Sequence, residues 1–429
     1  MFNTSVAKTY THHQKSVILD SPAPDQRRTI TAYVGGLDLT DGRYDSPEHS
    51  LYRTLPSLHS QDFYQGSAPG VTAETGPRQP WQDIHARITG ELAYDVLRNF
   101  TERWAKQGSG RHHLYRLNEE KFNLKPQTGD WNVQLLRSIT DDSAVFTNEA
   151  GMHTLTTKKS RTIEDSILRG YVKLIRTAER FIYIENQYFL GSAHVWSGDQ
   201  HVCCHHTVPA EITEKIIEKI RENQPFVVYV VIPLHPEGDP GAAATQEIIS
   251  WQRKTMEMMY ERIGECLRRE GRPGQPTDYL QFYCLVKKER PEDIPYNHLQ
   301  TPEPGSRAEV LRESRRFMIY VHSKLMIVDD SAALVGSANI NQRSLGGSRD
   351  TELAVVCHQP LETLLTRAGH LPRGEVARFR LRLMEEHLGD QSELLSSPHS
   401  EECLRWVRRV CKDNWRVCIT LTSLGYNSQ

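Results

Sequence analysis

One short pattern occurs twice in this chain of 429 residues: a histidine, any residue, a lysine, four further residues and an aspartate. The two copies are His13, Lys15 and Asp20, and His322, Lys324 and Asp329. Together they supply two imidazoles and two ammonium groups. Imidazole can act as a nucleophile or carry protons near neutral pH, and the ammonium groups can neutralise phosphate oxygens. The repeat therefore predicts an enzyme that attacks a phosphodiester.

The chemistry of such an attack explains why these residue types are needed together. The charge of a phosphodiester repels nucleophiles, so an enzyme must neutralise the oxygens, supply a nucleophile and protonate the leaving alcohol. A lysine two residues after a histidine on a strand shares its face, because side chains alternate. One imidazole would attack and form a phosphohistidine, while the other would protonate the leaving group and then activate water. This scheme requires no metal at the reacting phosphate.

An attacking imidazole needs its second nitrogen held by an acceptor that fixes the tautomer. We expect a carboxylate downstream in each half to do this, Asp83 in the first half and Glu352 in the second. We expect Asp20 and Asp329 to end their strands and to fix the following turns by hydrogen bonds.

Each copy of the pattern is also followed by a glycine-containing element and a short polar residue. These polar residues are Asp38 in the first half, and Ser337 and Asn339 in the second. The shared element makes a chance repeat improbable. We expect these three side chains to orient the histidines and lysines.

Length and composition limit the class of protein. The chain is long enough for one large domain or two to three ordinary ones, and its formal net charge of -2 provides no bulk field that favours nucleic acid or anionic membrane. None of the eight cysteines precedes Cys203, and their spacing is not that of a disulfide framework, which indicates a reducing compartment. The longest apolar run, 226–232, is too short to span a bilayer, and the N-terminus has no apolar signal core. We therefore expect a cytoplasmic protein that can contact a membrane surface.

The second half reads as alternating helices and strands. Helices are expected at 162–180, 210–222 and 242–270, and strands at 181–189, 226–232, 280–286, 317–321, 325–328 and 333–335. The Val-rich run at 226–232 is typical of a strand that is buried on both faces. This alternation predicts α/β layers.

The two copies have unequal surroundings. His322 follows about 150 residues of helix and strand, whereas His13 follows only twelve residues. We therefore divide the chain into a first, truncated catalytic lobe at 1–150, a second lobe at 151–395 and a C-terminal tail at 396–429. A partner or a missing N-terminal region is expected to complete the first lobe.

Several longer strings give the chain a family resemblance. They are THHQK at 11–15, YVGGLDLTDGRYDSP at 33–47, PRQPWQDIH at 77–85, WNVQLLRSI at 131–139, IYIENQYFLGS at 182–192, WQRKTMEMMY at 251–260, RRFMIYVHSKLMIVDD at 315–330 and GSANINQRS at 336–344. With these strings the chain resembles the phospholipase D superfamily, and specifically the plant-type phospholipases D, from about residue 9 to about residue 415.

The resemblance implies a fold and an activity. The fold would have two pseudo-symmetric lobes of mixed or parallel sheet flanked by helices. The activity would be hydrolysis of phosphatidylcholine and related lipids to phosphatidate and free head group, with transfer of the phosphatidyl group to small primary alcohols. By analogy His13, Lys15 and Asp20 would form the first catalytic set, and His322, Lys324 and Asp329 the second. His13 would be the nucleophile and His322 the general acid, and Gln187 would contact the lipid phosphate.

The resemblance also raises the question of calcium. The family usually needs calcium, partly through an N-terminal lipid-binding module, which we expect this chain to lack. The positions matching a calcium site in the catalytic region are His49 and Glu386, and a third expected position has Gln82 where the family's WHDIH string has histidine. Calcium prefers oxygen ligands, and a glutamine can supply a carbonyl oxygen, so the change puts the site in doubt without abolishing it.

Two rival functions remain open from the sequence. One is a catalytically incomplete regulatory isoform or a fragment, which the short first lobe favours, because lost strands expose sheet edges and apolar faces. The other is a phosphodiesterase that acts on nucleic acid. The near-neutral charge and the lack of a basic groove interleaved with aromatic residues argue against it.

Two further clusters have a less specific signal. The segment 201–206, HVCCHH, could bind zinc, but its spacing matches no common ligand pattern, so we expect a loop. The pairs at 287–288 and 315–316 are basic and could meet lipid phosphates, although such pairs are more often solvated surface.

Overall fold

The computed structural model describes residues 10–23, 25–107, 114, 117–118, 120–123, 131–146, 155–156, 162–199, 201–367 and 374–419. Its α-helices are α1 (Glu91–Lys106), α2 (Ser166–Thr177), α3 (Val208–Glu222), α4 (Ala243–Arg269), α5 (Arg307–Ser314), α6 (Gln342–Leu345), α7 (Pro360–Arg367), α8 (Glu375–Leu388) and α9 (Glu401–Ile419). Its strands are β1 (Lys15–Pro22), β2 (Arg28–Gly35), β3 (Trp81–Gln82), β4 (His85–Ile88), β5 (Asn132–Thr140), β6 (Leu155–Thr156), β7 (Thr162–Asp165), β8 (Phe181–Asn186), β9 (Val227–Val231), β10 (Leu280–Tyr283), β11 (Val286–Lys288), β12 (Arg316–Met318), β13 (Tyr320–Val321), β14 (Lys324–Val328), β15 (Ala332–Gly336) and β16 (Glu352–His358).

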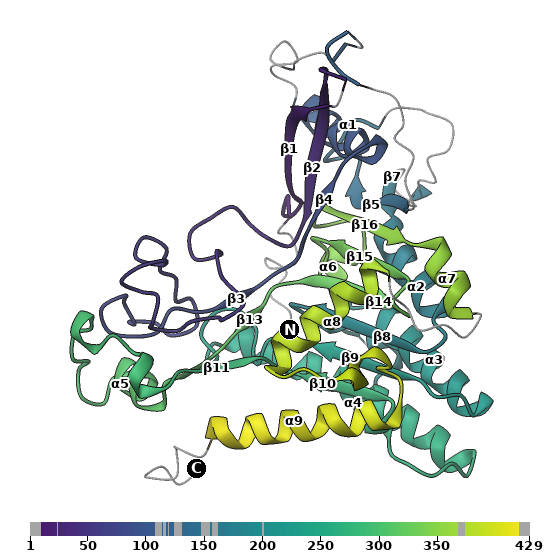
Figure 1. Ribbon diagram of the computed structural model, residues 1–429. Coiled ribbons are helices and arrows are strands. Elements are labelled where there is room, and N and C mark those ends of the chain that lie inside the picture. The colour runs from purple at the N-terminus through teal and green to yellow at the C-terminus, as the bar shows by residue number, and fades with distance from the viewer. Residues whose placement is uncertain are drawn as a thin grey trace.

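One large mixed sheet organises the molecule (Figure 1). In the described part of the chain it has nine strands in the order β10-β9-β8-β14-β15-β16-β5-β7-β6. Strands β10, β9 and β8 are parallel, whereas β14, β15, β16 and β5 each run antiparallel to their neighbours. The predicted α/β class is confirmed.

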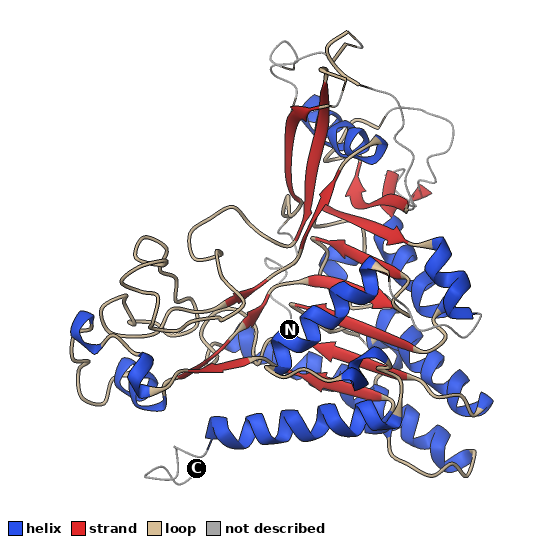
Figure 2. Cartoon of the chain, in the orientation of Figure 1, coloured by secondary structure: helices blue, strands red, loops and turns tan. Residues whose placement is uncertain are grey.

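The central strands are buried on both faces because each face is covered by a separate layer. Alternate residues of β8 show this: Ile182 and Ile184 pack with the helices α2, α3 and α4, while Phe181 and Tyr183 pack with β2, α1, α8 and α9. Figure 2 shows helices on both sides of the sheet. This two-sided burial explains why these strands read as continuous apolar runs.

Lys15 and Asp20 of the first motif lie on β1, and His13 lies just before it. In the described part of the chain β1 belongs to a separate antiparallel sheet of three strands, with the order β1-β2-β4. The segment that leads into β1 contacts the segment that leads into β16, where His12 forms a parallel bridge with Thr351. A second contact between the two halves of the chain is the two-stranded parallel sheet of β3 and β13, in which Val321 lies opposite Gln82. These two contacts bring the segments that carry the two motifs together.

Several element boundaries differ from the prediction. Residues 162–165 form strand β7, because they pair with β5, and α2 begins only at Ser166. The strand expected to end at Asp20 continues to Pro22. Strand β5, from the predicted first lobe, pairs with β16, so a boundary near residue 150 does not separate two sheets. The predicted tail contains α9, which packs through Leu404 and Val407.

Candidate active site

His13 is held by a buried carboxylate from the other half of the chain. Its Nδ1 lies 2.9 Å from both carboxylate oxygens of Glu352, whose side chain is fully buried at the start of β16. Ser337 Oγ donates to Glu352 Oε2 at 2.6 Å and accepts from the backbone N–H of Leu353 at 3.0 Å. The carboxylate is therefore fixed on one side by Ser337 and presents its other side to the imidazole.

His322 is held in the same way by a carboxylate from the first half. Its Nδ1 lies 2.8 Å from Asp83 Oδ2. Asp83 also accepts from the backbone N–H of Ile84 at 2.8 Å and from Trp81 Nε1 at 3.3 Å. The Trp81 ring lies 4.9 Å from the imidazole, centroid to centroid, and packs against it.

Both carboxylates were predicted, but the expected pairing within each half was wrong. The backbone N–H of His13 donates to the carbonyl of Thr351, which places Glu352 beside His13. The backbone N–H of His322 donates to the carbonyl of Gln82, which places Asp83 beside His322. The pairing is crossed because the strand contacts between the two halves, and not the order of residues within each half, decide which carboxylate meets which imidazole.

The two lysines are held by acceptors beside the histidines. Lys15 Nζ donates to the carbonyl of His13 at 2.9 Å and lies 3.3 Å from Asp38. Lys324 is fully buried, and its Nζ donates to the His322 carbonyl and, at 3.0 Å, to Gln187 Oε1. The lysines and the predicted Gln187 therefore lie beside the two imidazoles.

The halves are close enough to share one electrostatic environment. Burial has the largest effect on the pKa values of His322 and Lys324, and the positive charge of Lys15 lowers both further, while the charge of Glu352 raises the pKa of Lys324. Gly36 lies at the junction, where a Cβ atom would come within 2.2 Å of Asp83 Oδ1 and 3.0 Å of the His322 carbonyl oxygen. Only glycine allows this approach without displacing the carboxylate that holds His322.

Burial sets the protonation of the second motif. Burial, followed by the charge of Lys324, lowers the pKa of His322 to about 4, and burial lowers the pKa of Lys324 to about 7. At neutral pH His322 is thus a neutral imidazole that donates Nδ1–H to Asp83 and leaves the Nε2 lone pair free. A phosphodiester anion bound between the halves would favour the charged forms and raise both pKa values.

The comparison with family models matches residues 1–424 to the description "Phospholipase D". This chain belongs to the phospholipase D family. The match includes both halves of the site and every residue described above.

Curated relatives agree with this assignment. "Phospholipase D alpha 1" of Ricinus communis is 45% identical over 434 residues, which cover 96% of this chain and 53% of that protein. "Phospholipase D alpha 1" of Nicotiana tabacum and "Phospholipase D alpha 2" of Arabidopsis thaliana are each 44% identical, with the same coverage. This phospholipase D chain therefore spans about half the length of the curated relatives it matches.

Solved structures give a weaker comparison. The phosphatidylserine synthase of Haemophilus influenzae Rd KW20 aligns with 92% of this chain and 70% of that chain, at 12% identity and a TM-score of 0.38. This similarity is too low to support any statement about the phospholipase D chain.

The two motif aspartates lie away from the imidazoles. Asp329 accepts from the backbone N–H groups of Glu179, Arg180 and Phe181 at 2.7, 2.8 and 3.0 Å, so it ties the β14–β15 turn to the start of β8. Asp20 is exposed and pairs with Arg28 Nε at 2.7 Å. On an extended strand its distance from Lys15 is about 16 Å, so this carboxylate does not reach the lysine's phosphate site.

The expected calcium residues do meet, but as a hydrogen-bonded chain. His49 Nδ1 lies 3.0 Å from Asp45 Oδ2, and His49 Nε2 lies 3.3 Å from Glu386 Oε1. Burial alone would lower the pKa of His49, but the two carboxylates outweigh it and raise the pKa. Both imidazole nitrogens of His49 already face carboxylate oxygens, which leaves neither nitrogen free for a cation, and Gln82 contacts Glu185 instead. Among the described residues no group of three or more His, Cys, Asp or Glu is placed to hold a metal, so these residues as they stand do not fit a calcium ion.

Some site residues were not predicted. Tyr320 OH accepts from Gln187 Nε2 at 2.9 Å and from the backbone N–H of Glu237 at 3.1 Å, so it orients the glutamine. Tyr320 lies two residues before His322, and the strand period could have identified it. Trp81 gave no such signal, because its contact with His322 depends on the pairing of β3 with β13.

Of the remaining candidates, Asn339 is buried, and its Oδ1 has no hydrogen-bond partner in the described part of the chain. In the 201–206 segment, His206 is buried and its Nε2 donates to the Leu190 carbonyl at 2.7 Å. That histidine therefore serves the packing of the loop.

The placement of the motif aspartates predicts different effects of two substitutions. Asparagine tolerates the positive φ of 52° at position 329. In Asp329→Asn, however, the side-chain NH₂ replaces one carboxylate oxygen, so one backbone N–H loses its acceptor. We expect a loss of about 1–3 kcal/mol in the free energy of unfolding, measured by urea denaturation. Asp20→Ala should leave the unfolding midpoint unchanged. Equal effects of the two substitutions would contradict these assignments.

The low pKa of His322 predicts a pH dependence of stability. Its folded pKa of about 4 lies below the unfolded value of about 6.5, so the unfolded state binds the proton more tightly between these values. Stability should therefore fall as the pH is lowered through this window, by up to about 3 kcal/mol from this residue. We expect His322→Asn to lose that part of the slope in urea denaturation across this window. An unchanged slope would mean that His322 is not held neutral.

Proposed function

We propose that this chain cleaves the head-group phosphodiester of glycerophospholipids such as phosphatidylcholine, giving phosphatidate and the free head group. The observation that carries the proposal is the crossed pair of imidazoles, each with Nδ1 on a buried carboxylate, beside Lys15 and Lys324. The names of the relatives support the choice of phospholipid, because they are phospholipases D.

The reaction begins with attack by one imidazole. We assign His13 as the nucleophile: its Nε2 forms a bond to phosphorus while the bond from phosphorus to the head-group oxygen breaks. Glu352 accepts the Nδ1–H and stabilises the positive charge that develops on the ring. Lys15 and Lys324 neutralise the non-bridging oxygens, and Gln187 fixes Lys324 in that position.

His322 handles the protons. When the phosphate anion raises its pKa, His322 carries a proton on Nε2 and gives it to the leaving oxygen. The neutral ring then takes a proton from water, whose oxygen attacks phosphorus, and the bond from phosphorus to His13 breaks. A small primary alcohol in place of water gives a phosphatidyl alcohol by the same step.

The substrate requires contact with a lipid surface. In the described residues no helix is long and apolar enough to cross a bilayer. We propose peripheral association through local contacts in a reducing, cytoplasmic setting. All eight cysteines are free, which supports that setting.

Transfer to alcohol gives a direct test of activity. The purified chain, given phosphatidylcholine vesicles and 1-butanol, should produce phosphatidylbutanol. His13→Ala and His322→Ala should each lower the rate by at least about 100-fold, since each removes a group that acts in the transition state. His12→Ala is the matched control, because it changes the neighbouring imidazole, which is exposed.

The outcomes of this assay separate the rival functions. No product from a folded chain would favour the regulatory or fragment interpretation. Product that persists in both histidine variants would reject the phosphohistidine route. Cleavage of single-stranded DNA, with strongly salt-dependent binding, would favour the nucleic-acid alternative.

Binding to membranes should be weak and indifferent to calcium. The His49 imidazole already contacts the carboxylates of Asp45 and Glu386. Adding calcium or a chelator should therefore leave sedimentation with phosphatidylcholine vesicles unchanged. Strong calcium-dependent sedimentation would contradict this expectation, and its loss in Glu386→Gln would locate the cation at that residue.

A further inference from the structure

One buried carboxylate close to the His322 segment has no role in the proposed reaction. Glu185, on β8, has no exposed surface. It accepts hydrogen bonds from His387 Nε2 at 2.9 Å, from Tyr183 OH at 2.7 Å and from Gln82 Nε2 at 3.3 Å. Burial by itself would raise the pKa of Glu185, but the charge and hydrogen bond of His387 outweigh it and hold the pKa below its usual value. The carboxylate is thus an ionised acceptor in the core.

The contact with Gln82 connects this carboxylate to the active site. Gln82 precedes Asp83 directly, and its carbonyl accepts the backbone N–H of His322 at 2.7 Å. The side chain of Gln82 is therefore held by Glu185 while its backbone is held by His322. Through Gln82, the position of Glu185 affects the position of Asp83 relative to the imidazole.

The two carboxylates that hold the imidazoles differ in how much strand supports them. Glu352 begins the seven-residue strand β16, which is paired with β15 on one side and β5 on the other. Asp83 follows β3, which has two residues and, in the described part of the chain, pairs with no strand other than β13. Such a short ladder fixes the backbone poorly, so Asp83 depends on additional anchors such as the side chain of Gln82.

We propose that Glu185 and His387 form a positioning pair that acts through Gln82 to hold Asp83 and His322 in register. The proposal rests on the proposed function, since it assigns these residues to the same reaction. A role in stability alone accounts less well for the pair, because replacing buried ion pairs by apolar groups often leaves stability unchanged or improves it.

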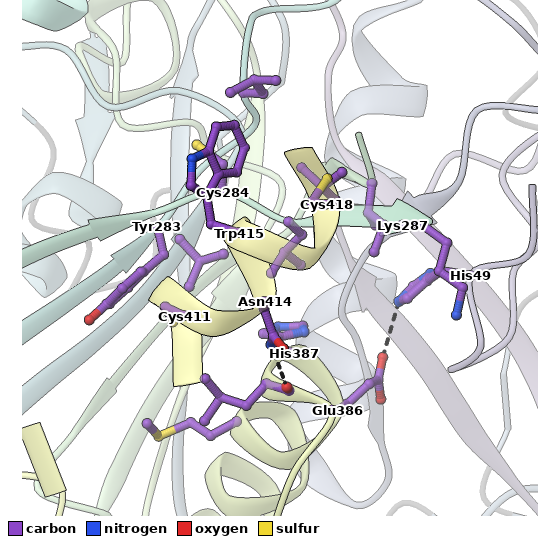
Figure 3. A pocket seen from close by; sticks show the side chains of 18 of the residues that line it. His49, Tyr283, Cys284, Lys287, Glu386, His387, Cys411, Asn414, Trp415 and Cys418 are labelled. Carbon is purple, nitrogen blue, oxygen red and sulfur yellow. Dashed lines mark hydrogen bonds and ion pairs between the residues drawn. The ribbon is translucent and has the colours of Figure 1, made fainter. Parts of the chain in front are cut away.

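The surroundings of His387 offer a way to test the pair. His387 lies on α8 and lines a cavity of about 550 Å³ together with Tyr283, Asn414 and Trp415 (Figure 3). Its side chain is 7% exposed, and its Nδ1 has no partner in the described part of the chain. Removing the ring by His387→Ala would open the Glu185 carboxylate to this cavity, through which free imidazole could enter.

The kinetic experiment uses phosphatidylbutanol formation by the full chain. We expect Glu185→Gln, Gln82→Leu and His387→Ala each to lower kcat about 10–100-fold, the usual effect of removing a group that orients an active-site residue, with KM changed less than about twofold. Added imidazole should restore kcat in His387→Ala and should not affect Glu185→Gln. The proposal would be overturned if the loss of kcat in each variant were fully explained by a smaller fraction of folded protein. It would also be overturned if imidazole did not restore kcat in His387→Ala.

A matched control separates positioning from stability. Ile184→Val changes the neighbouring residue of β8, whose side chain packs on the opposite face of the sheet, and it should cost about 0.5–1.5 kcal/mol. We expect kcat per folded molecule to be unchanged in this variant. A similar fall in kcat would mean that any weakening of β8 disturbs the site.

A spectroscopic readout keeps the test independent of turnover. The proton shared by His322 Nδ1 and Asp83 should give a downfield ¹H resonance that disappears in His322→Asn. We expect Glu185→Gln and Gln82→Leu to shift or broaden it, and Ile184→Val to leave it in place. This resonance tests the positioning role of Glu185 even if the chain proves inactive. An unchanged signal in Glu185→Gln would overturn that role, and a shifted signal would support it.

Discussion

The hydrogen bond from a histidine Nδ1 to a carboxylate of the opposite half is the interaction on which the rest of the site depends. His13 pairs with Glu352 and His322 pairs with Asp83, at separations of 339 and 239 residues along the chain. Each bond fixes a tautomer, presents Nε2 to the shared space and gives a buried carboxylate its partner. Because burying an unpaired charge is costly, neither half can keep its carboxylate buried without the imidazole of the other.

Close packing of backbone makes these crossed bonds possible. Gly36 lies against both Asp83 and the carbonyl of His322, at a distance that no side chain would allow. Ser337 stands behind Glu352 and completes its hydrogen bonds. Burial then sets the charge state: His322 is neutral without substrate, and Lys324 is close to losing its proton. An incoming phosphate anion supplies the charge that this environment lacks.

Much of this arrangement could be predicted from the sequence, and the failures have physical causes. The repeat identified both histidines and lysines, and the need for a tautomer-fixing acceptor identified Asp83 and Glu352. The pairing was assigned within each half because sequence proximity was the only guide, whereas the contacts of β3 with β13 and of His12 with Thr351 decide it. Thr162–Asp165 was predicted to be helical because its apolar spacing continues that of α2, but pairing with β5 overrides local periodicity. The role of Trp81 could not be predicted for the same reason as the crossed pairing.

The crossed arrangement also bears on how the chain folds. Contacts between residues hundreds of positions apart form only after the intervening chain has been ordered, because the entropy of closing so large a loop must be offset by structure already made. The nine-stranded sheet can grow largely from neighbouring strands, such as β14 with β15, whereas docking of the β1–β2–β4 sheet onto β16 brings together residues from opposite ends of the sequence. The catalytic groups would thus meet late in folding, and a partly folded molecule would have most of its core but no assembled site.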